Sequence, residues 1–147
     1  MYASAFVLGF HGCDEEVGEA VLSGQVGLKP STNDYDWLGH GVYFWENSPK
    51  RAMAWAQYVH ANPRLFRTKI NRPFVVGAVI NFVHALRAGA DADGRGDRSQ
   101  VPFDSVRGAF SEGKPLYTDA RIMAQTHIQL CVRNPKSIRG YFRPIVG

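Results

Sequence analysis

Short runs of apolar residues along the chain predict β-strands. Residues 5–11 (AFVLGFH), 41–45 (GVYFW) and 74–82 (FVVGAVINF) are dense in aromatic and β-branched side chains, which favour extended structure. Residues 126–132 (THIQLCV) and 138–146 (IRGYFRPIV) repeat this pattern near the C-terminus. Each of these runs is expected to form a strand.

Two helices are expected between the first strands. Asp14 is a favourable N-cap, with Glu15 and Glu16 placed in the first turn and Gly24 as a stop. The expected buried face of this helix is Val17, Ala20 and Val21. A second helix is expected to begin at Ser48, followed by Pro49 at the first helical position. Its expected buried stripe is Ala52, Trp55, Ala56 and Val59.

The order of these elements indicates an α+β domain. Both helices fall near the N-terminus and the later strands lie close together, which disfavours a βαβ winding. The glycine motif of a dinucleotide-binding Rossmann fold is also missing, because Gly39-His40-Gly41 precedes a strand and not a helix. The segments 27–41 and 88–102 are expected to be loops.

Composition adds few constraints. A chain of 147 residues fits one domain, and its net charge of +4 suits an acidic partner such as a dinucleotide or a nucleic acid, or no such partner at all. Cys13 and Cys131 lack metal-ligand spacing and are expected to be buried thiols. With no charged leader and no apolar run of about 20 residues, we expect a cytoplasmic protein without membrane contact.

Candidate chemistry gathers at three places. His11 and Gly12 end the first predicted strand, and Tyr43 on the second offers a flat face to an aromatic ligand. His127 and Gln129 share one face of a later strand, opposite its apolar face. Taken singly, each residue has an ordinary structural alternative, as a satisfied core histidine or a core tyrosine.

In order, these segments resemble the ADP-ribosyltransferase superfamily, in its diphtheria-toxin-like and poly(ADP-ribose) polymerase-like branch with a His-Tyr-Glu triad. His11-Gly12-Cys13 resembles the His-Gly-Ser strand end of that branch. Residues 39–45 (GHGVYFW) with 48–52 (SPKRA) resemble its Gly-x-Gly-Ile-Tyr-Phe-Ala strand and Ser-Lys-Ser-Ala helix start. Residues 105–108 (SVRG) and 129–138 (QLCVRNPKSI) resemble its Ser-Val-x-Gly segment and its Glu-strand.

The resemblance spans nearly the whole chain and implies a split β-sandwich, with two N-terminal helices around an NAD⁺ cleft. It implies that His11 bonds the adenosine ribose, that the Gly12 backbone bonds the nicotinamide amide, and that Tyr43 walls the nicotinamide. Trp55 is the candidate for a second stacking ring. No metal is implied.

Three positions depart from that family pattern. Cys13 and Arg51 replace serines, and Gln129 replaces the triad glutamate. A carboxylate there stabilises the positive charge that develops on the ribose, so a neutral amide is expected to lower activity by about 10²–10³-fold. In the resembled family, loss of this glutamate goes with single transfer or no transfer, so the resemblance implies mono-transfer and not polymer growth. Glu46, Glu112 and Asp119 are second choices for the carboxylate. Glu112 and Asp119 fall in an expected loop before the last strands, and strand alternation turns Glu46 away from Tyr43.

The resulting hypothesis is a mono-ADP-ribosyltransferase that moves ADP-ribose from NAD⁺ to a macromolecular acceptor, nucleic acid or protein, as a bacterial toxin with an antitoxin protein as its partner. The alternatives are a catalytically weak NAD⁺ or ADP-ribose binding module, an RNA 2′-phosphotransferase of the same fold, and a basic RNA-binding protein. A nucleic-acid acceptor would dock on a basic face formed by Lys50, Arg64, Arg67, Lys69 and Arg72. The alternative is that these side chains are only a solvated helix face.

Overall fold

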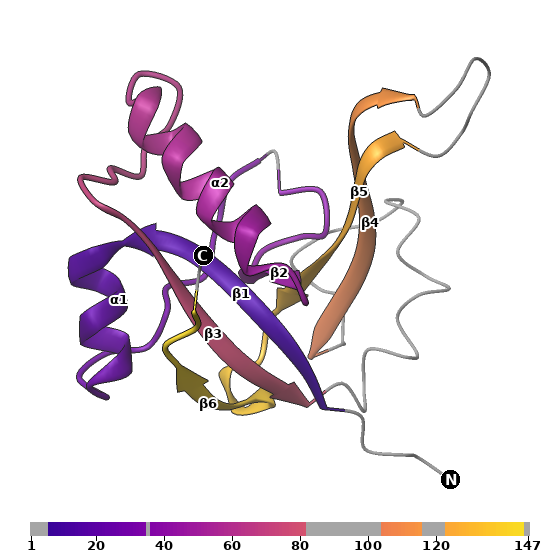
Figure 1. Ribbon diagram of the computed structural model, residues 1–147. Helices are drawn as coiled ribbons and strands as arrows, with labels where there is room; N and C mark the ends of the chain where they lie inside the picture. The colour runs from indigo at the N-terminus through magenta and orange to yellow at the C-terminus, as the bar shows by residue number, and fades with distance from the viewer. Residues whose placement is uncertain (1–5, 35, 82–103, 116–122, 146–147) are drawn as a thin grey trace, which may run out of the picture.

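The computed structural model describes residues 6–34, 36–81, 104–115 and 123–145, and these residues form an α+β architecture (Figure 1). One six-stranded antiparallel sheet has the order β4-β5-β2-β1-β3-β6. The strands are β1 (Phe6–Asp14), β2 (Val42–Glu46), β3 (Pro73–Asn81), β4 (Ser105–Pro115), β5 (Met123–Val132) and β6 (Ile138–Phe142). The helices are α1 (Glu15–Leu22), α2 (Pro49–Ala61) and the short 3₁₀ turn η1 (Pro135–Ser137). The predicted α+β class is confirmed.

The predicted strands are all present, with shifted ends. β1 runs three residues beyond His11 because it pairs with β3 along its whole length, from Phe6 opposite Asn81 to Asp14 opposite Pro73. β6 ends at Phe142, before the prediction, and Pro144 follows at a position where it has no N–H for a ladder.

Strand β4 lies where the sequence predicts a loop, so that prediction is wrong. The sequence reasoning treated the segment around Glu112 as a loop, because SVRGAFSEGKP is polar and contains glycine and lysine. β4 forms the outer edge of the sheet and pairs with β5, from Ser105 opposite Val132 onward. Edge strands are commonly polar because one side faces solvent, so the apolar pattern of a central strand is missing here.

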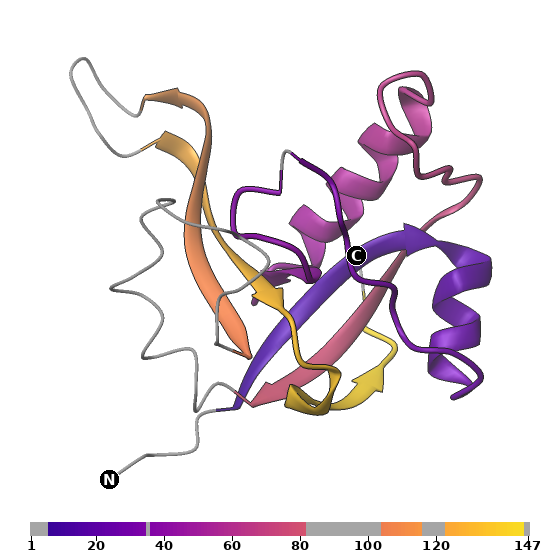
Figure 2. The ribbon, with the colours of Figure 1, turned by 180° about the vertical axis from the view of Figure 1, so that it is seen from behind.

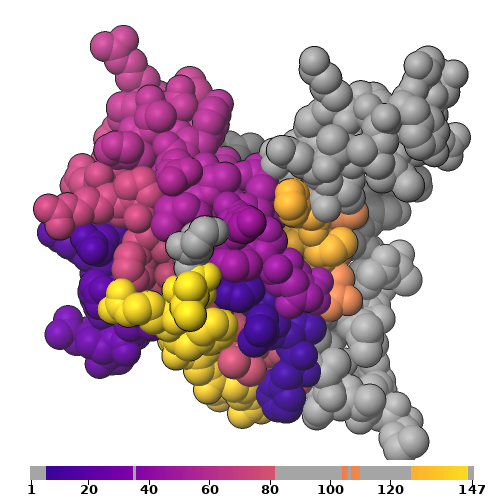
Figure 3. Space-filling view, in the orientation of Figure 1, coloured from indigo at the N-terminus to yellow at the C-terminus, as the bar shows by residue number. Residues whose placement is uncertain are grey.

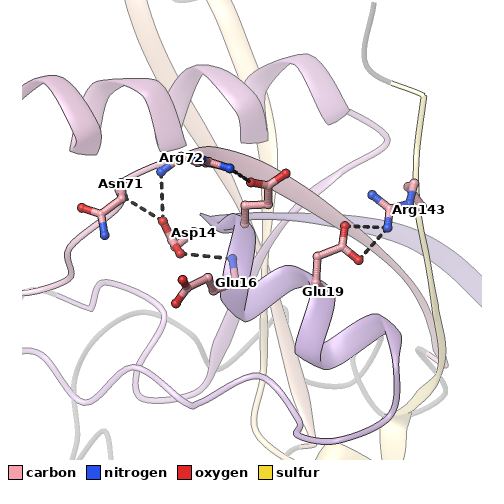
Figure 4. Close-up of polar contacts among 7 residues, drawn as sticks. Asp14, Glu16, Glu19, Asn71, Arg72 and Arg143 are labelled. Carbon is pink, nitrogen blue, oxygen red and sulfur yellow. Dashed lines mark hydrogen bonds and ion pairs between the residues drawn. The ribbon is translucent and has the colours of Figure 1, made fainter.

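Helix α1 begins at its predicted cap. The Asp14 carboxylate accepts a hydrogen bond from Glu16 N at 3.1 Å, and it also accepts from the backbone N–H groups of Asn71 and Arg72 (Figure 4). These bonds, led by the one from Arg72, hold the pKa of Asp14 below its usual value. One side chain therefore joins the end of β1, the start of α1 and the segment before β3.

The buried face of α1 differs from the prediction. Val17 is 45% exposed, while Gly18 and Val21 are buried. A Cβ at Gly18 would collide with the Phe74 ring, so the helix rests its glycine on that ring. Contact with β3 therefore sets the rotation of the helix, and helical spacing alone does not.

Helix α2 follows its predicted start. Ser48 caps it by accepting from Arg51 N at 3.2 Å, and Pro49 opens it. Its buried positions are Ala52, Ala56 and Val59, as predicted, whereas Trp55 is only partly buried.

The two helices lie on opposite faces of the sheet (Figures 1 and 2). α1 contributes Val21 to the larger core, with Phe44 and Leu130 from the central strands. α2 contributes Ala52 to a second core with Phe10 and Trp45. Cys13 and Cys131 are buried free thiols, as predicted. Among the described residues, neither helix has the length and hydrophobicity that crossing a membrane requires.

Candidate functional site

Strands β1 and β2 part at the centre of the sheet. They pair at Gly9 with Glu46 and at Phe10 with Trp45, and over the described strands the pairing ends there. β1 nevertheless continues along β3 to Asp14, and β2 continues along β5 down to Val42. We call this region, residues 11–14 of β1 facing residues 42–44 of β2, the β1–β2 divergence.

The backbone of Gly12 faces the β1–β2 divergence. Asn47 N donates to Leu8 O at 3.0 Å, so the polar backbone groups of Leu8 face β2. Backbone groups alternate between the two edges of a strand, so Gly12, four residues on, also faces β2. A continued ladder would join Gly12 to Tyr43, but the register stops first. The Gly12 N–H and C=O therefore lie at this edge, outside the ladder to β3.

His11 occupies the place of the missing ladder bond. Its Nδ1 lies 2.6 Å from the carbonyl oxygen of Tyr43. A carbonyl only accepts hydrogen bonds, so Nδ1 carries the proton and Nε2 of the neutral ring is an acceptor. Burial lowers the pKa of His11, which favours the neutral ring. The imidazole thus donates to the Tyr43 carbonyl, with which the Gly12 N–H would pair if the ladder continued. The second ring nitrogen, Nε2, is an acceptor.

The glycine at position 12 has a packing role as well. A Cβ there would collide with the backbone carbonyl of Ala52 and lie 3.2 Å from the Ala56 Cβ. The absent side chain therefore lets α2 pack directly on β1 beside the divergence.

The Tyr43 side chain points to the other side of β2, toward the loop before that strand. Its hydroxyl donates to Gly39 O at 2.6 Å and accepts from Leu38 N at 3.0 Å. Burial raises its pKa well above the usual value. The turn uses a positive φ of 89° at Gly39, which glycine adopts without strain. The structure therefore brings the His11 ring to the Tyr43 carbonyl and not to the phenol, whose hydroxyl holds the loop.

The loop 31–41 is held at further points. The Asp36 carboxylate accepts from Ser31 Oγ at 2.9 Å and from Asn33 N at 2.8 Å. At the other side of the loop, Arg133 donates to Leu38 O at 3.1 Å. These bonds fix the loop that carries Trp37.

Trp37 joins this loop to Gln129. Its indole Nε1 donates to Gln129 Oε1 at 2.5 Å. Gly108 lies opposite Gln129 in the β4–β5 ladder, and a Cβ there would lie 2.5 Å from Trp37 Cη2 and 2.8 Å from Leu38 Cδ2. The indole therefore occupies the space that Gly108 leaves. Sequence reasoning missed this contact, and the only signal for it was a lone tryptophan in a polar loop.

Trp45 lies beside Gln129 on the neighbouring strand. The two residues are opposite in the β2–β5 ladder. The Arg51 guanidinium lies 4.5 Å from the Trp45 ring centroid, and the His127 ring meets that ring edge-on at 5.9 Å. Arg51, which departs from the family serine, therefore makes a cation–π contact next to Gln129.

The other candidates lie elsewhere. Trp55 packs edge-on against Phe66 at 5.1 Å, in a cluster separate from His11 and Tyr43. Cys13 is in the larger core, and burial raises its pKa to about 12. Glu46 forms a 2.7 Å ion pair with Arg107. Asp119 and the side chain of Glu112 lie outside the described residues.

Within the described ranges, no group of three or more His, Cys, Asp or Glu residues is arranged to hold a metal ion. Comparison of the chain with protein-family models, with curated proteins and with solved structures finds no match.

Proposed function

We propose that the chain is an NAD⁺-dependent mono-ADP-ribosyltransferase and that NAD⁺ binds at the β1–β2 divergence, as in a split ADP-ribosyltransferase-like sandwich. The observation that carries the proposal is the diversion of the Tyr43 carbonyl to His11. It leaves the N–H and C=O of Gly12 at an edge where the β1–β2 ladder has ended.

The groups at the divergence match two parts of NAD⁺, the nicotinamide carboxamide and the adenosine ribose. A carboxamide has one carbonyl acceptor and an NH₂ donor, which complement the N–H and C=O of Gly12. The neutral His11 ring offers Nε2 as an acceptor for a hydroxyl of the adenosine ribose. In this arrangement the Tyr43 ring would lie beside the nicotinamide, while its hydroxyl keeps the 31–41 loop in place.

Gln129 is the expected partner of the ribose next to the bond that breaks. Nicotinamide leaves as a neutral group, and positive charge develops on the ribose carbon that it leaves. Gln129 supplies a hydrogen bond there without a charge, and its Oε1 already accepts from Trp37. We therefore expect slow transfer of single ADP-ribose units, about 10²–10³-fold below a carboxylate enzyme.

The hydrogen bond from Trp37 to Gln129 favours one alternative, a module that binds NAD⁺ or ADP-ribose without cleaving it. An amide whose oxygen is already engaged is a weak stabiliser of a cation. Release of free nicotinamide distinguishes the two functions, because only the transferase cleaves NAD⁺.

The test combines NAD⁺ binding by calorimetry with nicotinamide release by chromatography. His11→Ala should lose binding. His60→Ala is the matched control, because His60 makes the same kind of bond, Nδ1 to Ile70 O at 2.7 Å, at another part of the fold. Binding with nicotinamide release supports the transferase, and binding without release supports the module. No NAD⁺ binding by the unaltered protein would overturn both.

A further inference from the structure

An aromatic cluster stands at the end of α2, where the candidate site does not use it. Trp55, Tyr58 and Phe66 contact one another, with ring centroids 5.1 to 6.4 Å apart. Trp55 and Phe66 are partly buried against Val59 and its neighbours, whereas Tyr58 is 50% exposed. The two inner rings thus pack against Tyr58, which remains half exposed.

The loop after α2 is tied to the helix. His60 Nδ1 bonds to Ile70 O, and Lys69 Nζ donates to Pro63 O at 2.8 Å. Leu65 N donates to Asn62 O at 3.1 Å, and the Leu65 side chain is 65% exposed. Figure 3 shows the end of α2 and this loop at one corner of the molecule.

The segment that forms this corner carries charges of one sign. Residues 47–81 contain six Lys and Arg residues and no Asp or Glu. Arg51 lies over Trp45 and Arg72 pairs with Glu15, so these two are engaged elsewhere. Three exposed cations flank the aromatic cluster in the loop: Arg64, Arg67 and Lys69. We call these three residues, with Tyr58 and Leu65, the α2-end surface.

We propose that the α2-end surface binds single-stranded nucleic acid, with a base stacked on Tyr58 and phosphates held by the three cations. An exposed ring among cations is the usual composition of sequence-tolerant single-strand sites. The exposed apolar side chains, Tyr58 and Leu65, are too few for the apolar core of a stable protein interface. As the docking site for an acceptor strand, this inference rests on the proposed transferase function; the binding itself does not.

Binding is measured by fluorescence anisotropy, with the full chain and a labelled oligouridylate, over a range of salt concentrations. Three phosphate contacts predict a log–log salt slope of about −2 on a single strand. The double variant Arg64→Ala/Arg67→Ala should reduce the slope to about −0.7. Tyr58→Leu keeps an apolar side chain in the cluster, and should weaken binding by about tenfold while leaving the slope unchanged.

The matched control is Lys136→Ala/Arg139→Ala, which removes two exposed cations from η1 and β6. It should weaken binding much less than the Arg64/Arg67 pair. Equal losses in both double variants would overturn the proposal, because the binding would then follow net charge. A poly-glutamate peptide that binds more tightly than the oligonucleotide would overturn it too.

The two proposals fail separately. Arg64→Ala/Arg67→Ala should release nicotinamide from NAD⁺ at the unaltered rate when no acceptor is present, since both residues are exposed in the loop after α2 and belong to neither strand of the divergence. If the protein binds the oligonucleotide but not NAD⁺, the transferase proposal is refuted and the nucleic-acid-binding proposal stands. If the protein cleaves NAD⁺ but does not bind the oligonucleotide at low salt, the nucleic-acid-binding proposal is refuted and the transferase proposal stands.

Discussion

Replacing Gly108 with alanine puts one methyl group into the space that the Trp37 indole occupies. The added Cβ would lie 2.5 Å from Trp37 Cη2 and 2.8 Å from Leu38 Cδ2, closer than carbon atoms pack. The Tyr43 hydroxyl and Arg133 hold the backbone of Leu38, so the indole is the part that moves. Its displacement breaks the Nε1–Gln129 hydrogen bond.

The expected cost has two parts. A neutral hydrogen bond contributes about 0.5–1.5 kcal/mol net, and adding a methyl group to a packed contact costs about 1–3 kcal/mol. Trp37 is 41% exposed and can swing outward, so the packing part falls at its lower end. We expect Gly108→Ala to lower the free energy of unfolding by about 2 kcal/mol. Trp37→Phe, which removes the N–H donor together with part of the ring, should lower it by at least about 1 kcal/mol.

The assay is urea unfolding, together with the NMR resonance of the Trp37 indole N–H. Gly140→Ala is the control, because a Cβ there meets no atom within 4 Å, and it should change stability by less than about 0.5 kcal/mol. The indole resonance should shift in Gly108→Ala and stay in place in Gly140→Ala. If Gly108→Ala unfolds like the control and the resonance does not move, the Trp37–Gln129 contact is not what this glycine accommodates.

Further predictions concern pH, capping and the cleavage reaction. Burial lowers the pKa of His11 from 6.5, so the unfolded chain binds more protons and the free energy of unfolding should fall as pH drops below about 6.5; a His11→Gln variant with the same pH dependence in urea titrations would contradict this. Asp14→Ala should cost about 1–2 kcal/mol of stability and Asp14→Asn less, and equal losses would show that the cap is unimportant. Gln129→Glu should raise nicotinamide release by about 10²–10³-fold, because it places a negative charge beside the developing cation; an unchanged rate would remove Gln129 from the reaction. Expression in a bacterium should arrest growth, with relief by His11→Ala, if the enzyme is the proposed toxin; growth unaffected by active enzyme would discard that setting.

Local signals predicted the local structure well. The caps at Asp14 and Ser48 act within three residues of themselves, so the sequence alone contains the relevant chemistry. The alternation expected of a strand at residues 41–45 is also present, because Phe44 lies in the larger core while Tyr43 packs in a different cluster. Both rules depend on neighbours along the chain.

The features that the sequence did not predict depend on contacts between residues far apart in the sequence. The burial of Gly18 requires the Phe74 ring, and strand β4 requires β5 as its pairing partner. The bond from Trp37 to Gln129 joins residues 92 positions apart, and no periodicity indicates which tryptophan meets that amide. The same holds for the β1–β2 divergence, which arises where the His11 side chain takes a carbonyl that the backbone ladder would have used.

The central claim is that NAD⁺ binds at the β1–β2 divergence through the Gly12 backbone. Substitution of Gly12 is a poor test, because any side chain there would collide with the backbone carbonyl of Ala52 in α2. The direct measurement is an NMR titration that follows the Gly12 amide resonance as NAD⁺ is added, with Gly140 as the internal reference. If NAD⁺ binds there, the Gly12 resonance should shift saturably and the Gly140 resonance should shift little. The Gly12 shift should be weaker when the nicotinamide carboxamide is replaced by a carboxylate. A Gly12 resonance that stays in place at saturating NAD⁺ would contradict the claim.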